Sequence, residues 1–213
     1  MSQKLLAKIK EAVINMEPEL ARELTGQALE AGISPLEILR QGLIAGLEVV
    51  GVKFKNDDIF LPEVMISAKA FQDSFGLIEP RLKAGNYQPR GKILIGTVKG
   101  DVHDIGKNIV AVLLQGNGYE VMDAGADVPV AKFVQGAREF KPDVIGLSAL
   151  LTTTMPVMKQ VIEELKKAGL RDRVKVMIGG APVTQDYARQ IGADGYGEDA
   201  QAGVMLVKEW LPG

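Results

Sequence analysis

The sequence predicts an α/β protein in which an N-terminal bundle of helices precedes a doubly wound, five-stranded parallel sheet. Residues 1–83 place apolar side chains at helical spacing and contain no convincing strand, whereas residues 92–213 alternate β-branched runs with amphipathic segments. A stretch rich in Gly, Pro and polar residues, 84–91, separates these two patterns. We therefore expect a helical bundle at 1–83, a linker at 84–91 and a Rossmann-like domain at 92–213.

Four helices are expected in the first part of the chain. Apolar periodicity places them at about 5–13, 18–31, 35–50 and 62–78. Pro18 and Pro62 suit the first turn of a helix, where a backbone donor is not needed. Ser34 and Glu37 have the spacing of a capping box around Pro35, which predicts a well-defined start for the third helix. Four helices of this length with short connections form a small bundle.

The second part of the chain is expected to alternate strands and crossover helices, which implies a parallel sheet. The predicted strands are 92–98, 119–123, 144–148, 174–178 and 194–196. The predicted helices lie near 105–117, 130–140, 155–168, 184–191 and 199–210.

Composition excludes several functional classes. Apolar residues make up 46% of the 213 residues, charged residues make up 24% and the net charge is −2, so a nucleic-acid binder or a membrane-surface binder is not expected. The chain has no cysteine, which excludes disulfides and thiolate metal sites and is compatible with a reducing cytoplasm. No apolar stretch has the length of a membrane span or signal sequence. We expect a soluble, cytoplasmic protein.

The only histidine, His103, lies directly after the first predicted strand. Open α/β sheets bind their ligands at the carboxyl ends of their strands, so four loops are expected to meet around it. These loops are Asp101/His103/Asp104/Gly106, Asp123-Ala124-Gly125, Ser148 to Thr154, and Gly179-Gly180-Ala181-Pro182. The alternative is a polar loop whose half-exposed histidine is hydrogen-bonded to a neighbouring carboxylate.

Common site types fit these loops poorly. The segment 96–100 is not a G-x-G-x-x-G turn, and no G-x-x-x-x-G-K-[ST] occurs, so dinucleotide and triphosphate sites are not expected. A zinc site built from Asp101, His103 and Asp104 would depend on carboxylates. A Ser148–His103 hydrolase would lack the nucleophile-elbow motif.

Three motifs together resemble the signature of a cobalamin-binding domain. Asp101-x-His103-x-x-Gly106 is followed after 41 residues by Ser148-x-Leu150, and after 28 more by Gly179-Gly180. The N-terminal bundle also resembles the helical cap of corrinoid proteins in methyltransferase systems, including the methanol, methylamine and O-demethylase proteins and the cobalamin module of methionine synthase. The resemblance covers nearly the whole chain.

The resemblance implies a role for each motif. His103 would be the lower axial ligand of cobalt, and Asp101 would accept a hydrogen bond from its other ring nitrogen. Thr154 would extend this relay or, alternatively, would only cap the following helix. Gly106 would leave room for the nucleotide tail of the cofactor, in a slot lined by Ser148, Leu150 and Gly179-Gly180; the last pair could instead be a tight turn. Asp104 and Thr152 complete the expected cofactor contacts in this domain.

In the helical bundle, the segment 60–68 resembles the cap helix that covers the upper face of the corrin. Met65, Ala68 and Phe71 are the implied contacts. The alternative is that these apolar positions belong to the core of the bundle.

The implied function is methyl transport. Cobalt(I) would accept a methyl group from a donor-specific methyltransferase and deliver it to a second methyltransferase with a tetrahydrofolate or coenzyme M type acceptor, and a reductive activator would be a further partner. The chain would carry the cofactor, while catalysis belongs to its partners. Two alternatives are the small cobalamin-binding subunit of a mutase, which the helical cap disfavours, and a cobalamin sensor or regulator.

Overall fold

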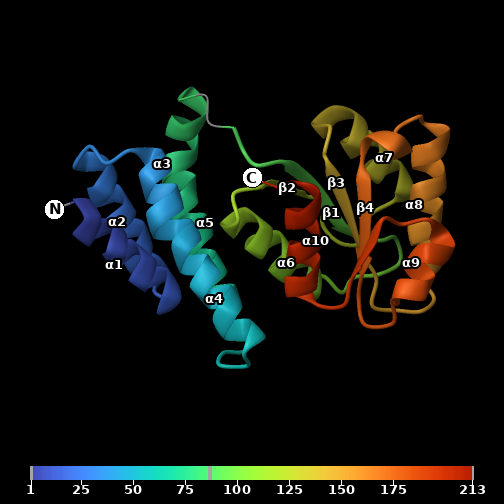
Figure 1. Cartoon of the computed structure of the whole chain (residues 1–213), viewed down its shortest axis with the longest axis horizontal. Coiled ribbons are helices and arrows are strands. Elements are labelled where there is room, and N and C mark those ends of the chain that lie inside the picture. The colour runs from blue at the N-terminus through green and yellow to red at the C-terminus, as the bar shows by residue number, and fades with distance from the viewer. Residues whose placement is uncertain (1, 86–87, 213) are drawn as a thin grey trace. The chain divides into compact units, whose positions relative to one another are not determined.

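The computed structural model describes residues 2–85 and 88–212 (Figure 1). The chain divides into two compact units: a helical unit of Met1–Gln88 with Gln115–Gly118, and a sheet unit of Pro89–Leu114 with Tyr119–Gly213. Within the described residues, no helix is long and apolar enough to cross a membrane. Asn86 and Tyr87 of the predicted linker lie outside the described residues, so the predicted domain limits stay a prediction.

The helical unit contains the four predicted helical segments. They are α1 (Ser2–Ile14), α2 (Pro18–Glu30), a third segment formed by α3 (Pro35–Glu37), η1 (Ile38–Ile44) and α4 (Ala45–Lys55), and α5 (Leu61–Ala84). Each helix buries one apolar stripe; in α1 this stripe is Leu6, Ile9, Ala12 and Val13. The apolar positions that predicted the bundle are therefore the positions that the bundle buries.

The third segment differs from the regular helix that we expected, because η1 is a π-helix. Two glycines bring this segment close to α1: a Cβ on Gly42 would lie 2.9 Å from Ile9 Cγ2, and one on Gly46 would lie 2.8 Å from Val13 Cβ. Only glycine permits this close approach. The predicted capping box is wrong, because the Ser34 side chain makes no capping hydrogen bond, although Pro35 does occupy the first turn.

The sheet unit is a five-stranded parallel sheet with the order β2-β1-β3-β4-β5. Its strands are β1 (Lys92–Thr97), β2 (Glu120–Asp123), β3 (Val144–Ser148), β4 (Lys175–Gly179) and β5 (Gly195–Gly197). This is the order of flavodoxin-like doubly wound sheets, whose topological switch point lies between β1 and β3. The predicted fold class is confirmed, and each predicted strand lies within two residues of an observed one.

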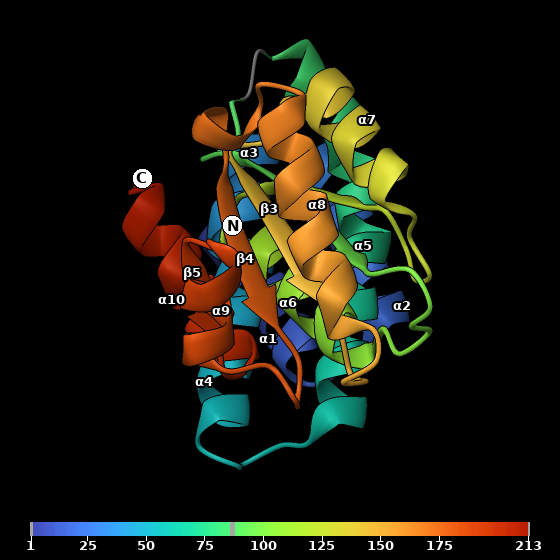
Figure 2. The same cartoon turned by 90° about the vertical axis from the view of Figure 1, so that its right-hand side faces the viewer.

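Helices cover both faces of this sheet. They are α6 (Ile105–Gly116), α7 (Val130–Phe140), α8 (Met155–Lys167), α9 (Gln185–Ile191) and α10 (Ala200–Trp210), with a short 3-10 turn η2 (Arg171–Arg173) before β4. Within this unit, α6 and α10 lie on one face and α7, α8 and α9 on the other (Figures 1 and 2). Phe133 of α7 is fully buried, and a Cβ on Gly96 would lie 2.8 Å from its ring. The glycine therefore lets α7 pack directly onto β1.

The strand register places four loops at one edge. Thr97 pairs with Ser148, Ser148 pairs with Gly179, and Gly179 pairs with Gly197. These residues form one row across the carboxyl ends of the strands. The loops that follow them therefore begin at the same level, as expected for a ligand-binding edge.

Candidate functional site

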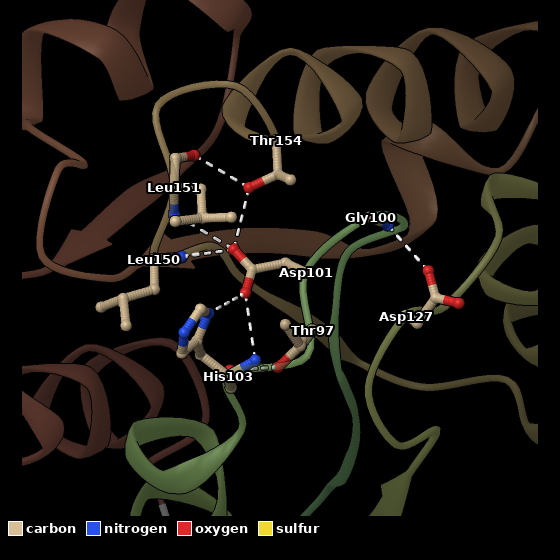
Figure 3. Close-up of polar contacts among 8 residues, drawn as sticks. All are labelled: Thr97, Gly100, Asp101, His103, Asp127, Leu150, Leu151 and Thr154. Atoms are coloured by element: carbon tan, nitrogen blue, oxygen red, sulfur yellow. Dashed lines mark hydrogen bonds and ion pairs between the residues drawn. The ribbon is translucent and has the colours of Figure 1, made fainter.

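The loop between β1 and α6 carries a buried carboxylate with five hydrogen-bond donors (Figure 3). Oδ1 of Asp101 accepts from the backbone N of His103 at 3.1 Å and lies 2.7 Å from its ring Nδ1. Oδ2 accepts from Leu150 N at 2.7 Å, Leu151 N at 3.1 Å and Thr154 Oγ1 at 2.8 Å. Asp101 thereby joins the loop after β1 to the loop after β3, which places the site at the switch point of the sheet.

These contacts determine the charge of Asp101. Burial by itself raises the pKa of this carboxyl, but the hydrogen bonds from His103, Leu150 and Thr154 outweigh burial and hold its pKa far below the usual range. Asp101 is therefore an ionised acceptor at neutral pH. The proton between Oδ1 and Nδ1 belongs to the imidazole.

The tautomer of His103 follows from this contact. In a neutral imidazole that donates from Nδ1, the lone pair lies on Nε2. The His103 side chain is 47% exposed, and Nε2 makes no hydrogen bond to the described residues. The geometry therefore presents one oriented nitrogen lone pair at the carboxyl edge of the sheet.

The position of Thr154 distinguishes between its two expected roles. Thr154 immediately precedes α8, but its side chain makes no capping hydrogen bond. Its hydroxyl is buried, lies 2.8 Å from Asp101 Oδ2 and also lies 2.8 Å from the carbonyl oxygen of Leu151. A hydroxyl has one proton, so it donates to one of these oxygens at a time. The helix-cap alternative is wrong, and the contact expected for a relay is present.

Four large apolar residues near His103 in the chain or beside its partner Asp101 are exposed, and we call them the apolar rim: Val102, Ile105, Leu150 and Leu151, at 71%, 56%, 44% and 40%, respectively. Only Leu150 was among the predicted contacts. A signal for Val102 was present in the sequence, because it is a large apolar residue inside a polar loop, where its burial is not expected.

The glycines predicted to line a slot differ from one another. Gly106 lies in the first turn of α6 and is exposed, and a Cβ there would meet nothing within 4 Å. Gly180 has φ +126°, and its Cβ would lie 1.9 Å from the carbonyl oxygen of Ala149. At Gly180 the tight-turn alternative is sufficient, because the chain's own backbone excludes a side chain. A Cβ on Gly179 would lie 3.0 Å from the oxygen of Gly197.

The remaining predicted contacts are less closely tied to the imidazole. Ser148 and Asp104 are partly buried and Thr152 is exposed; Ser148 O accepts from Val98 N at 3.0 Å. Met65, on α5 of the helical unit, is 37% exposed, whereas Ala68 and Phe71 are buried and Phe71 stacks on Phe75 at 5.6 Å between ring centroids. The core alternative therefore suits Ala68 and Phe71.

Two side chains that support the loop were not predicted from the sequence. Buried Thr97 donates from Oγ1 to the carbonyl oxygen of His103 at 3.1 Å. Asp127, between β2 and α7, accepts from Gly100 N at 2.8 Å. Neither residue had a sequence signal, because Thr97 has the appearance of an ordinary strand residue and Asp127 of an ordinary loop residue.

The donor set fits a metal that is already held by a macrocycle. Such a metal needs one further nitrogen ligand, which Nε2 of His103 would supply; the second ring nitrogen of His103 is bonded to a carboxylate, as in most metal-ligating histidines. Among the described residues there is no group of three or more His, Cys, Asp or Glu side chains that could hold a bare metal ion. The exposed apolar rim suits a large, mostly apolar ring.

Comparisons with known proteins agree with this chemistry. Two B12 binding domain family models match the chain, one over residues 91–205 and one over residues 5–79. The trimethylamine corrinoid protein of Methanosarcina barkeri is 47% identical over 98% of this chain and 97% of its own length. Dimethylamine corrinoid protein 3 of Methanosarcina acetivorans is 48% identical over 97% of each chain.

Among solved structures, the methanol:cobalamin methyltransferase complex of Methanosarcina barkeri matches with a TM-score of 0.89 and 33% identity, over 99% of this chain and 80% of that chain. The monomethylamine corrinoid protein of the same organism is 35% identical, with a TM-score of 0.54, over 98% of this chain and 99% of that chain. The family expected from the three motifs is confirmed: the chain belongs to the B12-binding corrinoid proteins, and its cofactor is a corrinoid of the cobalamin type.

Proposed function

We propose that this chain carries a methyl group, on a corrinoid ligated by His103, from a methyltransferase specific for a methylated amine to a second methyltransferase. The observation that carries the proposal is the imidazole of His103, which the buried Asp101 carboxylate holds with Nε2 directed away from its hydrogen-bonded side. When bound, the corrinoid supplies a cobalt centre that can hold and release the methyl group. The residues of the chain bind and orient this group.

His103 supplies the nitrogen ligand, and Asp101 keeps the proton on Nδ1 so that Nε2 stays available. An ionised carboxylate at Nδ1 also makes the ligand more basic. The contacts from Leu150, Leu151 and Thr154 prevent Asp101 from turning away. The exposed apolar rim would offer apolar contacts to a bound corrin ring.

The names of the relatives support one class of methyl donor. Proteins named for trimethylamine and dimethylamine are 47% and 48% identical over nearly the whole chain, whereas the methanol protein is 33% identical and the monomethylamine protein 35% identical. We therefore favour a tertiary or secondary methylamine as the donor. The partners would be a donor-specific methyltransferase, an acceptor methyltransferase of the coenzyme M or tetrahydrofolate type, and a reductive activator.

A reconstitution experiment tests the donor. The holoprotein is reduced with titanium(III) and mixed with a trimethylamine methyltransferase and trimethylamine, and methylation of the corrinoid is followed by its visible spectrum. We expect methylation with trimethylamine or dimethylamine and their methyltransferases, and none with methanol and its methyltransferase. Methylation in the methanol system alone would contradict the assignment of the donor.

A further inference from the structure

The loop that carries His103 is held from two sides, and only one of them belongs to the motif residues. On the β3 side, three donors bind the Asp101 side chain. On the other side, Asp127 binds the backbone of the same loop: its Oδ1 accepts from Gly100 N at 2.8 Å (Figure 3), and its own N donates to the carbonyl oxygen of Asp101 at 2.9 Å. Asp127 therefore contacts both ends of the Gly100–Asp101 dipeptide unit.

The backbone of Asp127 has an unusual conformation. Its φ is +53°, in the left-handed region that is uncommon for residues other than glycine and is visited more often by Asn and Asp than by other side chains. Its side chain is 44% exposed and pairs with Lys99 at 2.8 Å. An exposed ion pair of this kind contributes little to stability. What the conformation does achieve is to direct Oδ1 at Gly100 N, whose residue is itself left-handed with φ +87°.

The contact reaches the imidazole through Asp101. The Asp127 side chain fixes Gly100, the residue before Asp101, while Oδ2 of Asp101 is fixed by the loop after β3. Oδ1 of Asp101 then lies 2.7 Å from Nδ1 of His103. If Gly100 is released, the carboxylate keeps its donors on Oδ2 but can pivot about them, and the hydrogen bond that Nδ1 donates to Oδ1 is the contact that changes.

We propose that Asp127 is a positioning residue for the axial imidazole: by clamping Gly100 and Asp101, it sets how firmly His103 holds its tautomer and ligates the corrinoid. This inference rests on the proposed ligand role of His103. It extends that role to a residue in a loop that contains none of the three motifs.

The test uses variants that separate the clamp from its neighbours. Asp127→Gly removes the side chain while accepting a positive φ, so it adds no backbone strain. Asp127→Asn also tolerates the left-handed conformation and keeps an oxygen for Gly100 N, but it loses the charge. Lys99→Met removes the ion pair and leaves the carboxylate of Asp127 in place.

The first measurement uses the apoprotein. Because His103 is the only histidine, ¹⁵N NMR gives one pair of imidazole resonances, which report the tautomer directly. We expect the Nδ1-protonated form to dominate in the wild type, Asp127→Asn and Lys99→Met, and to lose population in Asp127→Gly. A residue that only stabilised the fold would not move this signal.

The second measurement uses the holoprotein in the cobalt(II) state. Electron paramagnetic resonance at one fixed pH reports the ratio of nitrogen-ligated to unligated cobalt(II), because only the ligated form shows the nitrogen splitting. We expect Asp127→Gly to lower this ratio about five-fold, the effect of one ordinary hydrogen bond. Asp127→Asn should keep the ratio within about two-fold of the wild type.

The outcomes are distinct. A wild-type holoprotein without nitrogen splitting would contradict the ligand role of His103, and thus the proposed function. Normal splitting with an unchanged ligation ratio and tautomer in Asp127→Gly would overturn the positioning role alone. Equal changes in all three variants would assign the effect to the ion pair and would also overturn the clamp. If Asp127→Gly does not fold, Lys99→Glu displaces the carboxylate by repulsion, and an unchanged ligation ratio and tautomer in that variant have the same meaning.

Discussion

The amino and carboxyl edges of the sheet each hold a carboxylate bound to a cationic or titratable side chain. They differ in whether that side chain keeps an unpaired hydrogen-bonding atom. At the amino edge, Asp194 lies 2.7 Å from Arg171 and accepts from Val176 N at 2.7 Å, and Arg171 also donates to the carbonyl oxygens of Val174 and Gly192. At the carboxyl edge, the donors of Asp101 saturate the carboxylate, while the imidazole that it orients keeps a nitrogen that has no partner among the described residues.

This difference separates a structural cluster from a binding site. The Arg171–Asp194 cluster satisfies its own hydrogen-bonding groups and ties η2 to the start of β5. The Asp101–His103 pair uses a satisfied group to hold an unsatisfied one at the surface. A buried charge alone therefore does not identify a binding site. A side chain with an unpaired hydrogen-bonding atom that its neighbours hold in place is the better criterion.

The largest expected effects concern two glycines of the carboxyl edge, Gly180 and Gly106, which differ in the space around them. Gly180→Ala should destabilise the protein by about 4 kcal/mol or prevent folding, because the new Cβ would lie 1.9 Å from the carbonyl oxygen of Ala149 at a φ of +126°. Gly106→Leu should fold with wild-type stability or better, since the position is exposed and helical. Chemical denaturation of the two apoproteins checks both expectations.

Corrinoid retention after gel filtration completes this comparison. Gly106→Leu should lose the cofactor while it remains folded, if the space at Gly106 receives the nucleotide tail. A folded Gly106→Leu protein with normal corrinoid occupancy would show that the tail lies elsewhere. Gly180 is unsuitable for this test, because a side chain there damages the fold before it can report on the slot.

The next effect in size concerns the two carboxylates. Asp101→Ala should lower the free energy of unfolding of the apoprotein by about 3 kcal/mol, because it leaves the N–H groups of His103, Leu150 and Leu151 without their acceptor. Asp194→Ala should also destabilise, but only Asp101→Ala should change the imidazole signals of His103. An altered His103 spectrum in Asp194→Ala would break the separation of the two edges.

The pH dependence of stability gives a control for Asp101. Its pKa is lowered in the folded protein from an ordinary value of 3.8, so its stabilising contribution is fully present above that value and is lost as the pH falls below it. Asp101→Asn removes this titration. The stability difference between the wild type and Asp101→Asn should therefore shrink as the pH falls below about 4, and a difference that grew on acidification would contradict the assignment.

A third comparison exchanges the partners of the two carboxylates. Arg171→Ala should cost about 2 kcal/mol of stability and leave corrinoid ligation unchanged, because Asp194 and two carbonyl oxygens lose a donor. His103→Ala should change stability by about 1 kcal/mol or less, retain corrinoid through its nucleotide tail and lose all nitrogen splitting of cobalt(II). Splitting that persists in His103→Ala would remove His103 from the site.

The sequence predicted the sheet well because buried parallel strands are continuous apolar runs, and because the residues of the motifs follow those runs directly. It could not predict η1, whose π-helical geometry accompanies the close packing of Gly42 and Gly46 on Ile9 and Val13. Contacts of that kind join residues more than 30 positions apart and have no local pattern.

The site shows the same limit. Asp101, His103 and Thr154 were predicted as a connected group, and the structure joins them. The donors Leu150 N and Leu151 N could not be predicted, since a backbone group has no sequence signature. The need for glycine at position 180 was assigned to a ligand, whereas the backbone of Ala149 already accounts for it.

The last comparison concerns Thr154. It measures how much one hydrogen-bond donor contributes to a carboxylate that has several. Thr154→Val keeps the shape of the side chain and removes the hydroxyl, so the apoprotein should lose about 1 kcal/mol of stability. The tautomer of His103 should stay unchanged, because Thr154 binds Oδ2 whereas His103 binds Oδ1. Thr154→Ser should restore the stability, since it keeps the donor. Chemical denaturation and ¹⁵N NMR of the single histidine measure the two quantities. If Thr154→Val altered the imidazole as strongly as Asp101→Ala does, the hydroxyl would control the ligand rather than merely hold the carboxylate, and Thr154 would belong on the open side of the comparison.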